Sequence, residues 1–421
     1  MGRTSRDNRG DRRPRIKPVE RIELNMEHAG RKLIIAGVLL VFGGALLAYA
    51  FAELMAPETG WRPVQANSSA GPTSAGDFTF LYESHSTAEA KGVTTLYSRV
   101  CQEAFQLFHS AQAYEGVTNV YAINRHPNEV LEIDEGLYRA FSQIAGSGRR
   151  ELYLGPIYER YDDLFFCQDD AQLAEFDPRL SDTVRQEYGE VLSFANDPES
   201  IRLELLGEDR VRLHVSEAYL AWAEENEVEN FIDFAWMQNA FVADYLAGEL
   251  TAGGYTAGVL SSYDGFTRNL DGRGVDYTFS LCHRRGNTVY PAADLYYSGP
   301  MSWVQMRDYP LGDADFLHYY ELRTGEIRTS YLDTSDALCR SSIDTLTCYS
   351  REKGCAEILL EMIPVYIAGE FREASIPQLA AGGTQSVYCR DGEVLHTDPD
   401  LKLGNFFQEE GLSYTARQIA S

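Results

Sequence analysis

The sequence lacks the short signatures that mark many common active sites. It contains no Walker A phosphate-binding loop, no Gly-x-Ser-x-Gly nucleophile elbow and no His-Glu-x-x-His zinc motif. Its seven cysteines include no Cys-x-x-Cys pair, and no histidine lies at zinc-site spacing from a cysteine pair, which argues against a structural zinc ion. It has no fixed-period repeat, so a repeat architecture is excluded.

Basic residues are also scarce. The chain holds 37 Lys and Arg against 63 Asp and Glu, which gives a net charge of −26 at pH 7. A surface this acidic repels nucleic acid, so nucleic-acid binding is excluded, and it favours either solubility or a cationic partner. The same field opposes phosphate-bearing substrates, which would need a metal ion or a local positive site.

The basic residues that do occur gather near the N-terminus. Residues 1–32 carry ten Arg and Lys against five Asp and Glu, and the twenty residues from Leu33 to Ala52 carry no charge. As a helix such a run is about 30 Å long, the thickness of a bilayer's hydrocarbon core. We therefore predict a cytoplasmic tail (1–32), a transmembrane helix (33–55) and an extracytoplasmic remainder, in a single-pass protein of the cell membrane. A cleaved signal peptide and a buried core helix are the alternatives.

Beyond the predicted span the composition changes again. Residues 56–76 are rich in Pro, Gly, Ser and Thr, which predicts a flexible linker. Residues 77–421 can form one large core or two closely joined lobes, and their helix and strand patterns interleave, so we expect an α+β domain. The expected elements are helices at Thr94–Ala113 and Met237–Leu250 and strands at Arg210–Val215, Phe231–Phe234 and Tyr255–Ser261.

All seven cysteines lie in this predicted outer domain. If that domain faces an oxidising compartment, some of them could form disulfides, and Cys339, Cys348 and Cys355 are close enough in sequence to close short loops. The odd number leaves at least one cysteine free.

Two segments in the second half of the chain resemble a known family. The first reads His318-Tyr-Tyr-Glu-Leu-Arg-Thr-Gly325, and the second reads Cys355-Ala-Glu-Ile-Leu-Leu-Glu361. They are similar to a His-Ile-Ile-Asp-Pro-Arg-Thr-Gly loop and to a helix that opens Ala-Asp-Ala-Leu-Ala-Thr, both found in the ApbE family of FAD:protein FMN transferases. In the loop His318 and the final Arg-Thr-Gly match, whereas Glu replaces Asp; in the helix Ala-Glu replaces Ala-Asp.

Further segments follow in the order of that family. Val120–Asn124 resembles an early strand, Ile232–Asp244 resembles a segment with the same acids at both ends, and Ser302 matches within a Thr-Ser-Gly-Asp-Tyr stretch. The resemblance covers most of residues 77–370 at low identity. It implies an ApbE-like mixed α/β domain and, through the family, a bacterial source.

The resemblance also implies a site and its cofactors, FAD and Mg²⁺. Glu357 and Glu361 would bind the metal ion, since side chains at i and i+4 project from one helix face. His318 would be the catalytic group that polarises the substrate or transfers a proton. The implied cofactor-binding residues are Asp244, Ser302, Glu321, Arg323, Thr324 and Gly325.

The departures from the family pattern fall in the segments that face the nucleotide. Where the family has paired glycines, this chain has Ala235-Trp236 in one segment and Asp264-Gly265 in another, and Asn239 replaces a lysine. A bulky ring and a carboxylate should therefore occupy space that a flavin nucleotide requires.

Three functions remain open on the sequence. The leading interpretation is an ApbE-like protein whose FAD site is lost or altered, and which acts as a binding or assembly factor for a membrane redox complex or flavoprotein. The second is an active Mg²⁺-dependent transferase that attaches FMN to Ser or Thr of a membrane flavoprotein, a reaction that depends on metal and positioning. The third is a cell-surface interaction protein unrelated to flavins.

Overall fold

The computed structural model describes residues 59–67, 71–312, 315, 318–409 and 411–419. All of these belong to one compact unit that runs from Glu58 to Ser421. The remaining unit, from Met1 to Pro57, lies outside the described residues.

The prediction of a single-pass membrane protein needs correction. Within the described ranges, no helix is both long enough and apolar enough to cross a bilayer. The charge-free run that motivated the prediction, together with the tail before it, falls outside those ranges. The finding conflicts with the predicted location in the cell membrane.

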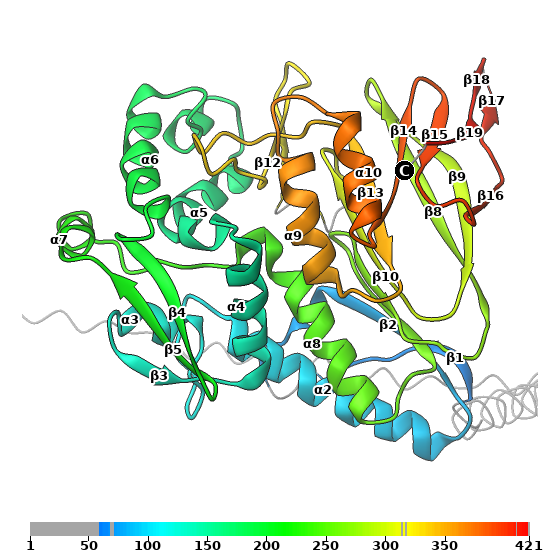
Figure 1. Ribbon diagram of the computed structural model, residues 1–421, viewed down its shortest axis with the longest axis horizontal. Helices are drawn as coiled ribbons and strands as arrows, with labels where there is room; N and C mark the ends of the chain where they lie inside the picture. Colours follow the sequence, from blue (N-terminus) through cyan, green and yellow to red (C-terminus); the bar gives the residue numbers. More distant parts are fainter. Residues whose placement is uncertain (1–58, 68–70, 313–314, 316–317, 410, 420–421) are drawn as a thin grey trace, which may run out of the picture. The chain divides into compact units, whose positions relative to one another are not determined.

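A nine-stranded sheet forms the centre of the described unit (Figure 1). Its neighbouring strands pair antiparallel, except that the last two, β15 and β19, are parallel. In spatial order the strands are β1 (Gly60–Pro63), β2 (Phe78–Ser84), β6 (Gly258–Ser262), β7 (Phe266–Asn269), β10 (Met301–Arg307), β13 (Thr345–Ser350), β14 (Gln385–Arg390), β15 (Glu393–His396) and β19 (Thr415–Gln418).

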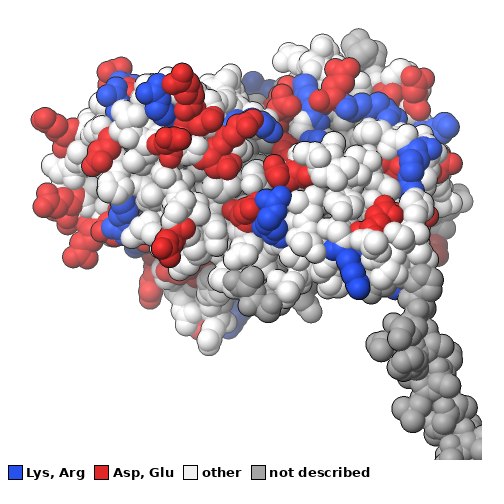
Figure 2. Space-filling view, turned by 90° about the horizontal axis from the view of Figure 1, so that it is seen from below, with Lys and Arg blue, Asp and Glu red and all other residues white. Residues whose placement is uncertain are grey.

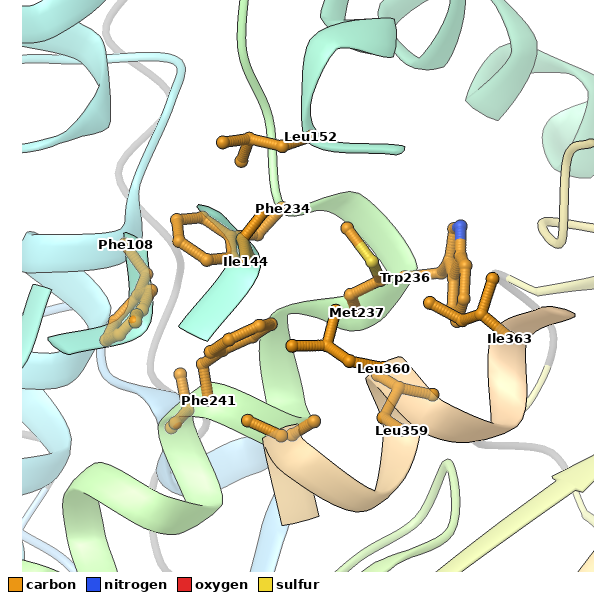
Figure 3. Packing of buried hydrophobic residues seen from close by; sticks show 14 of the residues in the cluster. Phe108, Ile144, Leu152, Phe234, Trp236, Met237, Phe241, Leu359, Leu360 and Ile363 are labelled. Carbon is orange, nitrogen blue, oxygen red and sulfur yellow. The ribbon is translucent and has the colours of Figure 1, made fainter. Parts of the chain in front are cut away.

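Three long helices pack on one face of this sheet: α2 (Thr87–Phe108), α8 (Gln238–Ala252) and α9 (Cys355–Tyr366). Local signals define their ends. Ser86 caps the first turn of α2 through its hydroxyl, which accepts the Glu89 N–H, and Gly253 follows the last residue of α8. The side chains between these helices and the sheet form the main hydrophobic core, where Phe241 of α8 and Leu359 of α9 lie within one cluster (Figure 3).

A helical lobe extends from that core, roughly between residues 120 and 230 (Figure 1). Its small sheet has β5 in the middle, paired antiparallel with β3 and β4. The lobe contains α3 (Val120–Arg125), β3 (Val130–Glu132), α4 (Glu135–Ser147), α5 (Gly155–Tyr161), α6 (Asp182–Ala195), β4 (Ile201–Gly207), β5 (Arg210–Val215) and α7 (Glu217–Glu225).

The other face of the main sheet is covered by strands instead of helices. Residues alternate along β10, so that Trp303 joins a second core while Val304 joins the main one. That second core lies under the antiparallel strands β8 (Asp276–Arg285), β9 (Thr288–Ser298) and β16 (Lys402–Gly404). The smaller elements are β11 (Tyr319–Glu321), β12 (Ile327–Thr329), α10 (Ile376–Ala381), β17 (Gln408–Glu409) and β18 (Leu412–Ser413).

Most expected elements are present with shifted ends, but two segments differ. Val120–Asn124, which resembled a strand, lies in helix α3, because the side chain of Asn119 caps it by accepting the Ala122 N–H. Phe231–Phe234 forms no strand. Its first two backbone N–H groups instead donate to Oδ1 of Asn124, at 3.0 and 2.9 Å.

Part of the predicted linker is ordered against the domain. Strand β1 pairs with β2, and the indole of Trp61 packs edge-on against Tyr277 with 6.0 Å between ring centroids. The aromatic ring inside a Pro- and Gly-rich stretch explains this, because it supplies apolar surface that can be buried. The disulfides that an oxidising compartment would permit are not formed, since all seven cysteines are free thiols.

Candidate functional site

The expected catalytic residue and two of the departures from the family pattern meet in a very small cavity. Trp236, Asp264 and His318 line it together with side chains of β10 and of the segment that follows β12. Its volume is about 10 Å³. That is roughly the space that one water molecule requires.

Trp236 fills much of the neighbouring space and is held in place from two sides. It lies in a short 3₁₀ helix, Ala235–Met237, and only 6% of its surface is exposed. Its ring packs edge-on against Tyr331 at 5.1 Å, and its indole Nε1 donates to the hydroxyl of Tyr158 at 3.3 Å. The preceding residue, Ala235, has φ of 45°, a left-handed backbone that favours the glycine of the family pattern.

Asp264 brings a carboxylate to the same cavity from the turn between β6 and β7. Its Oδ2 accepts a hydrogen bond from Asn239 at 3.0 Å, and burial raises its pKa to about 6. The next residue must be glycine: Gly265 has φ of 110°, and a Cβ there would lie 2.3 Å from the carbonyl oxygen of Gln305. The turn is therefore pressed against β10, which holds Asp264 in position.

His318 lines the same cavity. Its Nε2 is 3.1 Å from the hydroxyl of Tyr263, and burial lowers its pKa, so the ring is neutral near pH 7. A buried ion pair supports the segment before it: the guanidinium of Arg307 donates to Asp315 at 2.5 Å and to the carbonyl of Tyr263 at 3.0 Å. A neutral, hydrogen-bonded imidazole can accept or donate a proton.

Asp244 does not line the cavity but contacts the start of α9. It projects from α8 and accepts the backbone N–H groups of Cys355 and Ala356, at 2.8 and 2.9 Å, at the start of α9. Arg268 donates to its Oδ1 at 2.6 Å. A helix N-terminus attracts anions through its free N–H groups and dipole. Here the chain's own carboxylate occupies that place, so closely that a Cβ on Gly354 would lie 2.2 Å from Asp244 Oδ2.

The two glutamates expected to bind metal do not converge. Glu357 is exposed and accepts the Gly354 N–H at 3.2 Å, as a capping residue does. Glu361 accepts Lys353 Nζ at 2.5 Å and the hydroxyl of Thr384 at 2.6 Å. Across the part of the chain that the structure describes, no group of three or more His, Cys, Asp or Glu side chains could hold a metal ion.

The remaining expected site residues lie away from the cavity. The Ser302 hydroxyl donates to the carbonyl of Lys353 at 2.6 Å. Glu321, Arg323 and Thr324 are exposed in the β11–β12 hairpin, and Gly325 forms its turn with φ of 81°. None of these residues lines the cavity, so the structure brings only His318, of the expected set, together with Trp236 and Asp264.

Sequence reasoning missed the residues that hold His318. The adjacent Asp264 could have drawn attention to Tyr263, which contacts the imidazole. Nothing in the sequence pairs Arg307 with Asp315, because that contact depends on how the segment after β10 folds back.

Comparisons with known proteins support the fold. The chain is similar to the ApbE protein of Thermotoga maritima, with a TM-score of 0.54 and 14% identity over 78% of this chain and 94% of that one. It is also similar to the flavin transferase ApbE from Vibrio cholerae, with a TM-score of 0.52 and 12% identity over 83% of this chain and 97% of that one. No protein-family model and no curated protein sequence matches. The chain therefore has the mixed α+β fold seen in the ApbE flavin transferases.

Proposed function

We propose that this protein uses the flavin-transferase fold without transferring FMN and acts as a binding or assembly factor. The observation that carries the proposal is the cavity of about 10 Å³ bounded by Trp236, Asp264 and His318. Pockets for organic ligands of cofactor size have volumes of roughly 300–1,000 Å³. The side chains present do not fit FAD in this region.

The groups available for a metal ion support the same proposal. Asp244 is already bonded to Arg268 and to two backbone N–H groups, and Glu361 is bonded to Lys353. Phosphoryl transfer depends on a metal bridging the phosphates and on positioning. These carboxylates stabilise the fold instead. They are therefore not available to bind Mg²⁺ or to position the phosphates of FAD.

The charge of the helical lobe favours a particular class of partner. Between residues 120 and 230, Asp and Glu outnumber Arg and Lys by 25 to 10. Acidic side chains are dense over the half of the molecule that holds this lobe (left in Figures 1 and 2). Such a surface attracts a protein with a basic face and accelerates their association. We propose that the partner is a flavoprotein or redox complex with such a face.

Flavin binding and transfer can be measured separately. The full chain is titrated with FAD, with and without Mg²⁺, while flavin fluorescence is followed, and it is then incubated with FAD and a peptide that contains an acceptor Ser or Thr. The proposal predicts no covalent FMN on the peptide by mass spectrometry. Saturable FAD binding without transfer would favour a flavin-binding module and contradict the lack of room around Trp236, whereas an absence of binding agrees with the proposal and also with an interaction protein unrelated to flavins.

A working transferase is the second candidate, and one observation favours it. His318 is neutral and lies in the same cavity as Asp264, so a proton-transfer group remains next to a carboxylate. If Trp236 moved aside, that pair would face the opened space. Covalent FMN that disappears in His318→Ala and Glu357→Ala, but persists in Asp391→Asn, a variant of a side chain that is 91% exposed, would support this candidate and overturn the first.

A further inference from the structure

A second and much larger cavity lies at the edge of the second core. It has a volume of about 630 Å³. Tyr296 and Tyr297 of β9 line it on one side, and Trp303 and Tyr349 of the main sheet line it on the other. It shares no lining residue with the cavity around Trp236. Its size, and a lining that combines aromatic with charged side chains, suit a small organic molecule that carries a charge.

The aromatic floor of this cleft is rigid. Trp303 is fully buried, stacked on Phe279 at 4.8 Å and packed against Tyr349 at 4.3 Å between ring centroids. Tyr297 packs on the same indole at 5.1 Å. Because Tyr297 packs against rings that are already ordered, a ligand that contacts Tyr297 costs little additional conformational entropy.

Carboxylates outnumber cations around the cleft. The acidic lining residues are Asp276, Glu352, Asp398 and Asp400, and the basic ones are Arg351 and Lys402. The guanidinium of Arg351 is engaged with backbone carbonyls, donating to Ser298 O at 2.9 Å. Asp398 is fixed beside the floor, since its Oδ2 accepts the Tyr349 hydroxyl at 2.8 Å. The cleft is therefore net negative in a molecule whose total charge is −26.

We propose that this cleft binds an organic ammonium cation, with the ammonium group held by the rings of Tyr296 and Tyr297 and by the carboxylates of Asp398 and Asp400. An anionic ligand would be opposed both by the lining and by the field of the whole molecule. A cation is attracted by the carboxylates, and aromatic rings stabilise ammonium groups when they lie against the ring face. This site is independent of the proposed loss of flavin transfer, because it is built on the other face of the sheet.

The test compares two probes that differ in one atom. Choline and 3,3-dimethylbutan-1-ol have the same shape, but the second has carbon in place of the ammonium nitrogen. Each is titrated into the full chain, and binding is followed by calorimetry and by saturation transfer to the methyl protons. We expect saturable binding of choline and affinity about tenfold weaker for the neutral alcohol. No choline binding, or equal binding of both, would overturn the proposal.

Single substitutions locate the site. Asp400→Asn removes one exposed carboxylate of the rim and should weaken choline binding about threefold, whereas Lys402→Gln should strengthen it. Asp391→Asn removes the same charge from a side chain that is 91% exposed and does not line this cleft, so it should leave the affinity unchanged. If Asp391→Asn weakened binding as much as Asp400→Asn, a general field effect would explain the data and the site would be rejected.

A second pair of variants tests the aromatic contact. Tyr296→Ala should weaken choline binding about threefold, and Tyr296→Phe, which keeps the ring, should not. Equal loss in both variants would assign the effect to the hydroxyl, which accepts Asn405 Nδ2 at 2.7 Å, and would contradict the proposed binding mode.

Discussion

The two faces of the central sheet differ in the volume of the cavities beside them. On the helix-covered face, the region around Trp236, Asp264 and His318 leaves about 10 Å³, whereas the face under β8 and β9 opens into a cleft of about 630 Å³. The closed region holds Trp236 and Asp264, at positions where the resemblance places a nucleotide, whereas none of the implied catalytic, metal-binding or cofactor-binding residues lines the open one. The fold therefore does not by itself indicate where this chain has room for a ligand.

The largest expected effect on stability comes from removing the indole that fills the region around Trp236. Trp236→Ala should lower the free energy of unfolding by about 4 kcal/mol, because a buried aromatic side chain is lost and a cavity remains. Urea denaturation measures it. Trp61→Ala is the matched control, since Trp61 is 42% exposed on the edge strand β1, and it should cost much less. Equal costs at the two positions would contradict the view that the Trp236 region is tightly filled.

The second largest effect on stability is expected from breaking the buried ion pair between Arg307 and Asp315. Asp315→Asn leaves the guanidinium of Arg307, which is 1% exposed, without its charged partner, and should destabilise the fold by about 3 kcal/mol. Thermal and urea unfolding measure the change. The exposed pair between Glu393 and Arg417 provides the control, because Glu393→Gln should cost less than about 1 kcal/mol.

Protonation of Asp264 should have a smaller effect on stability, and the direction of its pH dependence is defined. Burial raises its pKa to about 6, so the folded state binds a proton more tightly than the unfolded chain, and stability falls as the pH rises from about 4 to about 6. Asp264→Asn should therefore stabilise the protein at pH 7, by about 1 kcal/mol after allowance for solvent screening. The gain should vanish near pH 4. A gain of the same size at both pH values would refute this account.

The smallest effect is expected on the open face. Tyr296 is 36% exposed, so Tyr296→Ala should change the free energy of unfolding by less than about 1 kcal/mol. Comparison with Trp236→Ala in the same denaturation experiment then contrasts the two faces directly. If Tyr296→Ala lowered the free energy of unfolding as much as Trp236→Ala, the side chains that line the cleft would also be essential for stability.

Local patterns predicted the elements whose signals are local. The alternation in Arg210–Val215 gave a strand with the same ends as β5, and the two glycines after residue 252 marked the end of α8. Phe231–Phe234 was wrongly predicted as a strand because the acceptor of its backbone N–H groups, the side-chain Oδ1 of Asn124, lies more than a hundred residues away in the sequence. Apolar runs this short do not reveal which group will accept their hydrogen bonds.

The candidate site was predictable only in part, for a similar reason. The bulky and acidic substitutions at Trp236 and Asp264 are visible in the sequence, and both residues do meet His318 at one cavity. The position of Asp244 was not predictable, because its contacts with Cys355 and Ala356 exist only once α8 packs beside α9. In the sequence, the Asp244 carboxylate is as compatible with binding a cofactor as with capping a helix.

The carboxylate of Asp244 at the start of α9 has a consequence for how the protein is maintained in a cell. A ligand that binds only the native state adds to its stability in proportion to supply, so enzymes that depend on such a ligand lose native population when it runs short. Here the negative charge that satisfies the helix is covalently part of the polypeptide. The start of α9 should therefore form equally well in flavin-starved and flavin-replete conditions.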